Sequence, residues 1–166
     1  IKAQEYVAIQ QSSDRSDPRN IGTYLKSGFI SDFKGSMIDA LIDGFRPDPA
    51  RATIVFFQHS GGAIGRVAPD ATAFPHRHSK NNMFSVVAWN LDGDAAPHVR
   101  FIKDYWATLE PFTDGYYTNE VGDEAQGIVD TNYQGNIGRL RTLKKKYDPG
   151  NLFRLNANVL PGASSG

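Results

Sequence analysis

The sequence predicts an α+β fold in which an antiparallel sheet is backed by helices. Short segments rich in β-branched and aromatic residues are interspersed with two amphipathic segments of helical period. The expected order along the chain is strand, helix, strand hairpin, strand, helix and strand. Helices separated by strand pairs favour an antiparallel α+β sandwich over a parallel doubly wound sheet. The length of 166 residues corresponds to a single domain.

The first part of the chain is predicted to contain a strand followed by a helix. Residues 5–10 alternate apolar and small or polar side chains, which indicates a strand, and residues 24–30 suit a short extended piece. A helix is expected over residues 31–45, capped by Ser31 or Asp32. Its predicted buried stripe consists of Phe33, Ile38, Leu41, Ile42 and Phe45.

The middle of the chain is predicted to form a hairpin and a further strand. Residues 52–58 are the most apolar predicted strand, and such a continuous run indicates burial on both faces. Residues 60–62 suit a turn, after which residues 63–67 are the expected return strand. A long polar loop over residues 69–82 leads to a strand over residues 83–90.

The last part of the chain is predicted to contain two helices and one strand. The helix over residues 97–110 buries a stripe formed by Val99, Ile102, Tyr105 or Trp106, and Leu109. Residues 116–121 are the expected final strand. A helix over residues 136–147 carries the apolar stripe Ile137, Leu140, Leu143 and Tyr147. A helix of about 12 residues is marginal alone, so we expect it to dock on another surface.

Composition excludes several classes of protein. The 18 basic residues equal the 18 acidic ones, and the lysines at 144–146 suit the solvated end of a helix, so no nucleic-acid surface is expected. The absence of cysteine excludes disulfides, thiolate metal sites and thiol nucleophiles, but leaves the compartment open. No apolar run reaches the ~18 residues of a membrane helix, so no membrane partner is expected. Because the chain begins at Ile1, we expect a removed start or a fragment.

A histidine cluster is the first candidate site. His76 and His78 flank Arg77, and two histidines at this spacing are able to bind a metal. A third ligand has no source beyond His59 or His98, so we predict no metal site and favour a solvated polar loop. A third interpretation is that the cluster lines a substrate cleft as hydrogen-bond donors.

A tyrosine and an asparagine form the second candidate site. In a strand, Tyr117 and Asn119 project from the same face, which places a phenol beside an amide. A tyrosine acts as a base only where a cation or a strong hydrogen bond stabilises the phenolate, and tyrosine is also a common core residue of strands. The nearby carboxylates show no catalytic pairing and are expected to solubilise a loop: Glu120, Asp123 and Glu124.

The residues as a set resemble the berberine-bridge-enzyme-like, FAD-linked oxidoreductases of the vanillyl-alcohol-oxidase-type superfamily. Residues 117–119 match the family's Tyr-x-Asn motif, and residues 61–77 resemble a stretch of its substrate domain. The C-terminal signature is matched by residues 133–136, 139–140 and 144–158. The resemblance covers nearly the whole chain, from residue 5 to residue 161.

The resemblance implies a division of the chain and a missing partner. In the family, FAD lies in a separate N-terminal flavin domain, which we expect to be absent here. We therefore expect residues 1–125 to be part of the substrate-binding domain, as one ferredoxin-like β-α-β-β-α-β half. Residues 126–161 would be the berberine-bridge-like segment that returns to the flavin domain, and residues 162–166 a frayed end.

The resemblance also implies roles for single residues. Tyr117 is expected to be the base that takes the proton from a substrate hydroxyl while a hydride passes to flavin N5. The residues expected to contact the cofactor are asparagines: Asn119, Asn156 and Asn158. His76 and Arg77 are expected at the substrate opening, where Arg77 would also support the phenolate. Thr118 and Glu120 replace more apolar residues of relatives, which leaves the substrate open.

The implied function is that of the substrate-binding and C-terminal part of an FAD-dependent oxidoreductase. The whole enzyme would oxidise an alcohol or a sugar hydroxyl of a small molecule, with O2 as the expected acceptor, and the 166-residue chain alone would be inactive. The alternative is a flavin-free, stand-alone module that binds a small molecule or a protein. An autonomous module should pack its C-terminal helix on its own sheet, whereas a fragment should expose it or oligomerise through the tail or a sheet edge.

Overall fold

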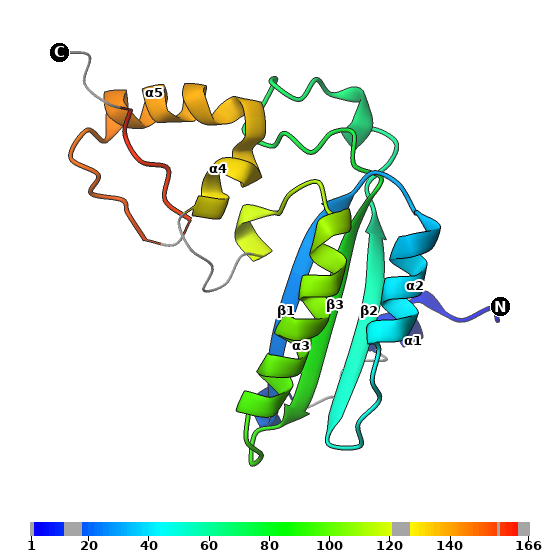
Figure 1. Cartoon of the computed structure of the whole chain (residues 1–166). Coiled ribbons are helices and arrows are strands. Elements are labelled where there is room, and N and C mark those ends of the chain that lie inside the picture. Colours follow the sequence, from blue (N-terminus) through cyan, green and yellow to red (C-terminus); the bar gives the residue numbers. More distant parts are fainter. Residues whose placement is uncertain (1, 12–17, 121–126, 156, 163–166) are drawn as a thin grey trace.

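The computed structural model describes residues 2–11, 18–120, 127–155 and 157–162. It contains a three-stranded antiparallel sheet, two helices that cover one face of it, and a helical C-terminal segment at one end of the sheet (Figure 1). The strands are β1 (Ile21–Ile30), β2 (Arg51–His59) and β3 (Asn81–Asn90), and the helices are α1 (Tyr6–Gln10), α2 (Gly35–Gly44), α3 (Ala96–Leu109), α4 (Gly127–Tyr133) and α5 (Ile137–Tyr147). The predicted α+β class is confirmed.

The last strand in the chain is the central strand of the sheet. The strand order is β1-β3-β2, and β3 is antiparallel to both neighbours. Val87 illustrates the register, because it is opposite Tyr24 of β1 and Thr53 of β2. Since β1 and β2 are parallel to each other, α2 is the crossover of a split β-α-β unit.

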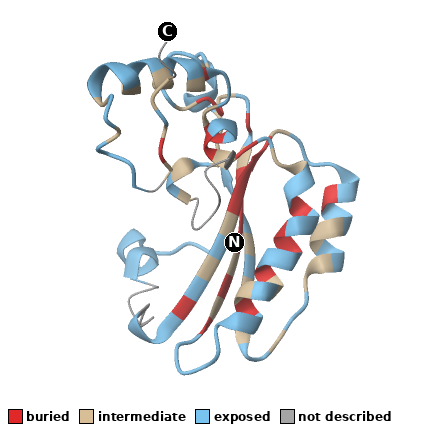
Figure 2. Ribbon diagram, turned by 60° about the vertical axis from the view of Figure 1, so that its left-hand side comes forward, coloured by how far each residue is buried: buried red, intermediate tan, exposed pale blue. Residues whose placement is uncertain are grey.

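The core lies between the sheet and α2 and α3 (Figure 2). Alternate strand residues point to the helices, as the two-residue period of a strand requires. The stripe predicted for α3 is confirmed, because Ile102, Tyr105, Trp106 and Leu109 are buried. The sheet and α2 contribute the other buried residues of this cluster: Ile30, Met37, Met83, Val87 and Trp89. Complete burial of one such aliphatic side chain contributes about 1.5–3 kcal/mol.

The opposite face of the sheet, here called the open face, is only partly covered. On it, Leu25, Ile54 and Phe56 remain 41%, 52% and 45% exposed. The expectation that residues 52–58 are covered on both faces is therefore wrong. The reason is topological: β3, and not β2, takes the central place, so β2 is an edge strand with one strand neighbour.

The start of the chain departs from the prediction. Residues 6–10 form the short helix α1, in which no residue is buried, and the first strand is β1. An alternation of apolar and polar side chains over so few residues is not enough to specify a strand. In α2, Met37 is fully buried whereas Ile38 and Ile42 are exposed, so part of the predicted stripe is wrong. Lys34, rather than Ser31 or Asp32, occupies the N-cap position.

The predicted return strand over residues 63–67 is also wrong. That stretch contains a 3₁₀ turn, Ile64–Arg66, within a long loop of residues 60–80. The loop is closed at its base by a hydrogen bond of 2.7 Å from the Ser60 amide to the Lys80 carbonyl. Because β3 supplies the partner of β2, no return strand is needed inside the loop.

The predicted final strand is replaced by a turn. Phe29 exchanges main-chain hydrogen bonds of 2.8 and 2.7 Å with Gly115 and Asp114, which starts a strand-like pairing with β1. Gly115 has φ +134°, a conformation suited to glycine, and beyond it the chain forms the 3₁₀ turn Thr118–Glu120. Val121, the last residue of that prediction, lies outside the described residues.

The C-terminal segment packs beside the sheet and not on it (Figure 1). The helix α5 confirms the prediction for residues 136–147, whereas α4 was not predicted. No residue of α5 is buried, and its inner side lies against Thr72 and Ala73 of the long loop. The frayed end predicted for residues 162–166 falls mostly outside the described residues. Among the helices of the described ranges, none has the length and apolar character needed to cross a membrane.

Candidate active site

An aromatic cavity lies where the end of β1 meets the long loop and the C-terminal segment. Its volume is about 230 Å³. It is lined by residues from three parts of the chain: Ala73, Phe74, Pro75, His76, Tyr116, Tyr117, Thr118, Asn119, Asn132 and Tyr133. The structure therefore brings together three of the predicted site residues, which are His76, Tyr117 and Asn119.

Tyr117 is held by two rings and one amide. Its ring lies edge-on to Phe29 and Phe74, with centroids 6.5 and 6.0 Å away. Its hydroxyl oxygen accepts a hydrogen bond of 3.0 Å from Nδ2 of Asn119. The residue as a whole is 36% exposed and lines the cavity. The two residues were predicted to be neighbours on a strand, whereas the structure joins them through a 3₁₀ turn.

The adjacent Tyr116 is in a different environment. Its hydroxyl donates a hydrogen bond to Oε1 of Glu110. Burial, together with this acidic acceptor, raises the pKa of Tyr116 to about 12. Tyr116 therefore resists loss of its proton and is not a candidate base.

His76 is buried, and its side chain connects segments that are distant in the sequence. Its ring stacks on Phe29 at 4.3 Å, and Nε2 lies 3.0 Å from the carbonyl oxygen of Asn132. Because that oxygen only accepts, Nε2 carries the proton and Nδ1 accepts from Nε2 of Gln134, at 3.3 Å. Gln134 also donates to the carbonyl of Asp114, at 2.9 Å. Burial lowers the pKa of His76, in keeping with this neutral tautomer.

The interpretation of residues 76–78 as a solvated loop is wrong for His76, which is only 3% exposed. Arg77 braces the same loop: its guanidinium donates to the Phe74 carbonyl at 3.2 Å and to Oγ1 of Thr72 at 2.7 Å. It also lies 4.8 Å from the centroid of the Phe74 ring. The roles of His76 and Arg77 in substrate binding stay predictions.

The remaining predicted cofactor contacts belong to the C-terminal tail. Asn158 is buried in the tail and does not line the cavity of Tyr117 as described above. Asn156 lies outside the described residues. The contacts of Asn119, Asn156 and Asn158 with a flavin stay predictions.

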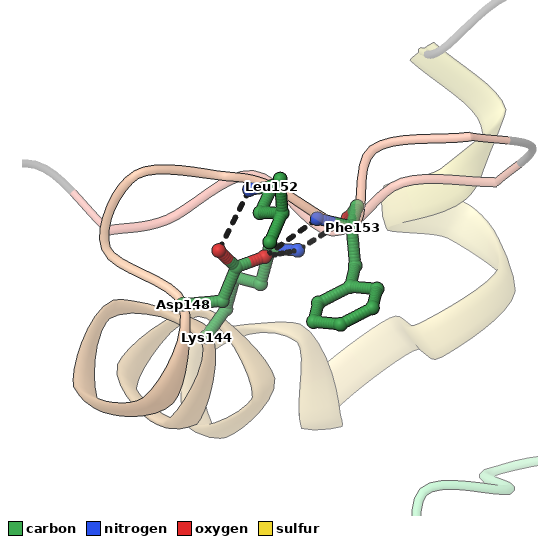
Figure 3. Close-up of polar contacts among 4 residues, drawn as sticks. All are labelled: Lys144, Asp148, Leu152 and Phe153. Atoms are coloured by element: carbon green, nitrogen blue, oxygen red, sulfur yellow. Dashed lines mark hydrogen bonds and ion pairs between the residues drawn. The ribbon is translucent and has the colours of Figure 1, made fainter.

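Asp148 organises the turn that follows α5 (Figure 3). Its carboxylate accepts hydrogen bonds from the amides of Leu152 and Phe153, at 2.7 and 3.0 Å, and pairs with Lys144 Nζ at 2.5 Å. These contacts, the one with Lys144 above all, lower the pKa of Asp148. The turn presents apolar side chains that are about three-quarters exposed or more: Tyr147, Leu152, Phe153 and Leu155.

Glu120 is a site residue that the sequence analysis missed, because it was expected only to solubilise a loop. Its Oε2 accepts hydrogen bonds from Oγ of Ser27, at 2.6 Å, and from Nδ2 of Asn82, at 2.8 Å. These partners are 93 and 38 residues away in the sequence, so no local pattern indicates the contact. Ser27 lies on β1 and Asn82 on β3.

Phe29 joins the cavity to the open face of the sheet, because its ring contacts both His76 and Tyr117. The lining of the cavity is largely apolar and aromatic, and the hydroxyl of Tyr117 and the amide of Asn119 are placed polar groups in it. Apolar surface with a few placed polar groups is typical of cofactor sites.

Comparisons with known proteins point to one family. A family model described as "Berberine and berberine like" matches residues 116–160, which include Tyr117 and the whole C-terminal segment. The FAD-linked oxidoreductase YgaK of Bacillus subtilis (strain 168) is 36% identical over 113 residues, which are 68% of this chain and 25% of that protein.

Solved structures share the fold. Glycopeptide hexose oxidase complexed with teicoplanin has a TM-score of 0.74 at 23% identity, over 82% of this chain and 32% of the other. Berberine bridge enzyme from Eschscholzia californica has a TM-score of 0.73 at 17% identity, over 88% of this chain and 34% of the other. The chain thus spans about a quarter to a third of these proteins.

The fold and the berberine-type segment are those found in part of FAD-linked oxidoreductases. The chain belongs to the berberine bridge enzyme-like family.

Proposed function

We propose that this chain is the substrate-binding and C-terminal part of an FAD-dependent oxidoreductase that oxidises an alcohol or a sugar hydroxyl. The observation that carries the proposal is the hydrogen bond from Asn119 to the hydroxyl of Tyr117, two residues that line an aromatic cavity. The similarity to a hexose oxidase supports a sugar hydroxyl as the reacting group. O2 is the proposed electron acceptor.

In the proposed reaction, Tyr117 removes the proton of the substrate hydroxyl. The bound flavin supplies the hydride acceptor. Asn119 donates a hydrogen bond to the Tyr117 oxygen and so orients the hydroxyl. The rings of Phe29 and Phe74 fix the orientation of the Tyr117 ring and keep water from its edges.

The exposed apolar turn after α5 supports a second part of the proposal, which is docking on a flavin-binding domain. Leu152, Phe153 and Leu155 are 76%, 78% and 84% exposed, and Asp148 holds them in a defined turn. An autonomous module was expected to pack its C-terminal helix on its own sheet, and α5 contacts the long loop instead. This arrangement favours the oxidoreductase part over the flavin-free binding module.

The proposal is tested by Tyr117→Phe in the flavin-loaded protein that carries this chain. The rate constant of flavin reduction by an alcohol or sugar substrate should fall by roughly 10²–10⁴-fold, the usual contribution of a general base. Tyr6→Phe is the matched control, because Tyr6 is exposed on α1, and it should leave the rate unchanged. A Tyr117→Phe protein that reduces its flavin at the original rate would remove Tyr117 from the base role.

A further inference from the structure

Glu120 lies in the same turn as Tyr117 and is bonded to the sheet. The Glu120 amide donates a hydrogen bond of 2.9 Å to the carbonyl of Tyr117, which closes the 3₁₀ turn. The Glu120 carboxylate leaves this turn toward the open face, where it accepts from Ser27 and Asn82. The turn that carries Tyr117 is therefore connected to β1 and β3 through one side chain.

The two partners of Glu120 are diagonal neighbours on the open face. In the sheet register, Ser27 is opposite Phe84 and Asn82 is opposite Phe29, so all four side chains lie on one face. Ser27 and Asn82 are 5% and 2% exposed. Buried polar groups are costly without a partner, and the described structure gives Ser27 Oγ and Asn82 Nδ2 one common acceptor, Oε2 of Glu120.

The orientation of the Asn82 amide follows from this contact. An Asn82 oxygen facing the carboxylate would repel it, so the amide presents Nδ2 to Glu120. Two donors, Ser27 Oγ and Asn82 Nδ2, then converge on one oxygen of Glu120. Such convergence fixes the position of the acceptor more tightly than a single bond does.

Upstream of the turn, the chain is attached to β1 at Phe29, and Tyr116 packs against the core. The Asp114 amide donates to the Phe29 carbonyl, and the Phe29 amide donates to the Gly115 carbonyl, before the chain turns away. Beyond these hydrogen bonds, the Tyr117 ring contacts Phe29 and Phe74 edge-on, and these contacts are apolar. Glu120 therefore supplies the polar anchor at the far end of the turn.

We propose that Glu120 is a positioning residue, which uses Ser27 and Asn82 as anchors to fix the hydroxyl of Tyr117 at the cavity mouth. The proposal rests on the proposed function of Tyr117 as the base. A shift of about 1 Å in a reacting group costs up to roughly 10²-fold in rate, so an anchor of this kind has a measurable effect. Glu120 itself transfers no proton in this proposal.

Two substitutions of Glu120 distinguish its role in positioning Tyr117 from an effect of its charge. In Glu120→Gln, the amide oxygen is still able to accept from both Ser27 and Asn82, whereas the charge is lost. In Glu120→Ala, both hydrogen bonds are lost. Ser27→Ala removes one of the two anchors and only one hydroxyl, so it perturbs the fold least. Asp43→Ala, at an exposed carboxylate on α2, is the matched control for loss of a carboxylate.

The first measurement is structural and uses the full 166-residue chain without a cofactor. Nuclear Overhauser contacts from the Tyr117 ring to the rings of Phe29 and Phe74 should be present in the parent chain, in Glu120→Gln and in Asp43→Ala. In Glu120→Ala they should be lost, with the contacts of the α3 core retained. Persistence of the Tyr117 contacts in Glu120→Ala would overturn the proposal.

The second measurement uses the flavin-loaded protein that carries this chain. Glu120→Ala should lower the rate constant of flavin reduction by roughly 10–100-fold with little change in KM, and Glu120→Gln should stay within about threefold. In a Tyr117→Phe background, Glu120→Ala should have almost no further effect, because it acts through the missing hydroxyl.

The outcomes distinguish this proposal from the proposed function. If Tyr117→Phe slows flavin reduction and Glu120→Ala adds its full effect to it, Glu120 does not act through Tyr117 and the positioning role is overturned. If Tyr117→Phe has no effect, the proposed base is wrong, and the structural measurement alone then decides whether Glu120 positions the ring. A Glu120→Gln protein as slow as Glu120→Ala would show that charge, and not position, matters.

Discussion

Nε2 of His76 lies 3.0 Å from the main-chain oxygen of Asn132, a residue 56 positions further along the chain. This contact joins the long loop between β2 and β3 to the last turn of α4. The helices α4 and α5 pack on neither face of the sheet, so contacts with the long loop, those of His76 and Asn136 among them, attach the C-terminal segment.

The burial of His76 predicts that the free energy of unfolding depends on pH. Its pKa is lowered in the folded chain, so the unfolded chain binds more protons at mildly acidic pH. The stabilisation is complete above the ordinary histidine value of 6.5 and is lost as the pH falls through the lowered pKa. Asp114, the charged group facing the ring, opposes the lowering only in part.

The test is urea unfolding of the parent chain and of His76→Gln between pH 5 and pH 8. The free energy of unfolding of the parent should fall toward pH 5 more steeply than that of His76→Gln. His78→Gln, at an exposed neighbour, should behave like the parent. Parallel pH profiles for the parent and His76→Gln would contradict a role of His76 in this pH dependence.

Gly115 is predicted to tolerate no side chain. Its φ of +134° disfavours any other residue, and a Cβ there would lie 2.6 Å from Cε1 of His76. Gly115→Ala should therefore destabilise the fold by about 1–3 kcal/mol, measured by chemical unfolding. Gly138→Ala is the control, because no atom lies within 4 Å of a Cβ at this position in α5. It should be neutral or stabilise by up to about 1 kcal/mol. Equal effects of the two substitutions would contradict the prediction.

Asp148 is predicted to hold the apolar turn after α5. In Asp148→Ala, the amides of Leu152 and Phe153 lose their acceptor, so their hydrogen exchange should become roughly tenfold faster. Because the pKa of Asp148 is lowered, the turn should be intact above pH 3.8 and loosen as the pH falls through the lowered value.

Asp130→Ala provides the matched control for the Asp148 prediction. Asp130 forms an ion pair of 2.6 Å with Arg141, but both side chains are well exposed, and exposed pairs contribute little. Exchange at Leu152 and Phe153 should stay as in the parent chain. If Asp148→Ala also left these two amides unchanged, the turn would owe its shape to other contacts.

Elements with long-range periodicity were predictable, and elements fixed by distant contacts were not. The buried stripe of α3 repeats over four turns, so its face was predicted correctly. Residues 116–121 have the composition of a strand, but the conformation of Gly115 and the contacts of Glu120 with β1 and β3 impose a turn. A strand propensity of a few tenths of a kcal/mol per residue does not outweigh such contacts.

In the candidate site, too, local relationships were predictable and contacts between distant residues were not. Tyr117 and Asn119 are separated by one residue, so a strand and a 3₁₀ turn both bring them close, and their pairing was predicted although the local structure was not. The contacts of Glu120 were not predicted, because its hydrogen-bond partners Ser27 and Asn82 are distant in the sequence and come close only in the fold. His76 was misinterpreted for the same reason, since the burial that decides its protonation comes from Phe29 and from α4.

The order of the strands has a consequence for how the chain is made. Since β3 lies between β1 and β2 and follows both, no strand pair of the sheet forms until residues 81–90 have left the ribosome. Until then, two apolar strands are exposed without partners, and all the strand pairings close long stretches of chain. Such non-local pairing slows folding and leaves unpaired strands open to aggregation in newly made chains.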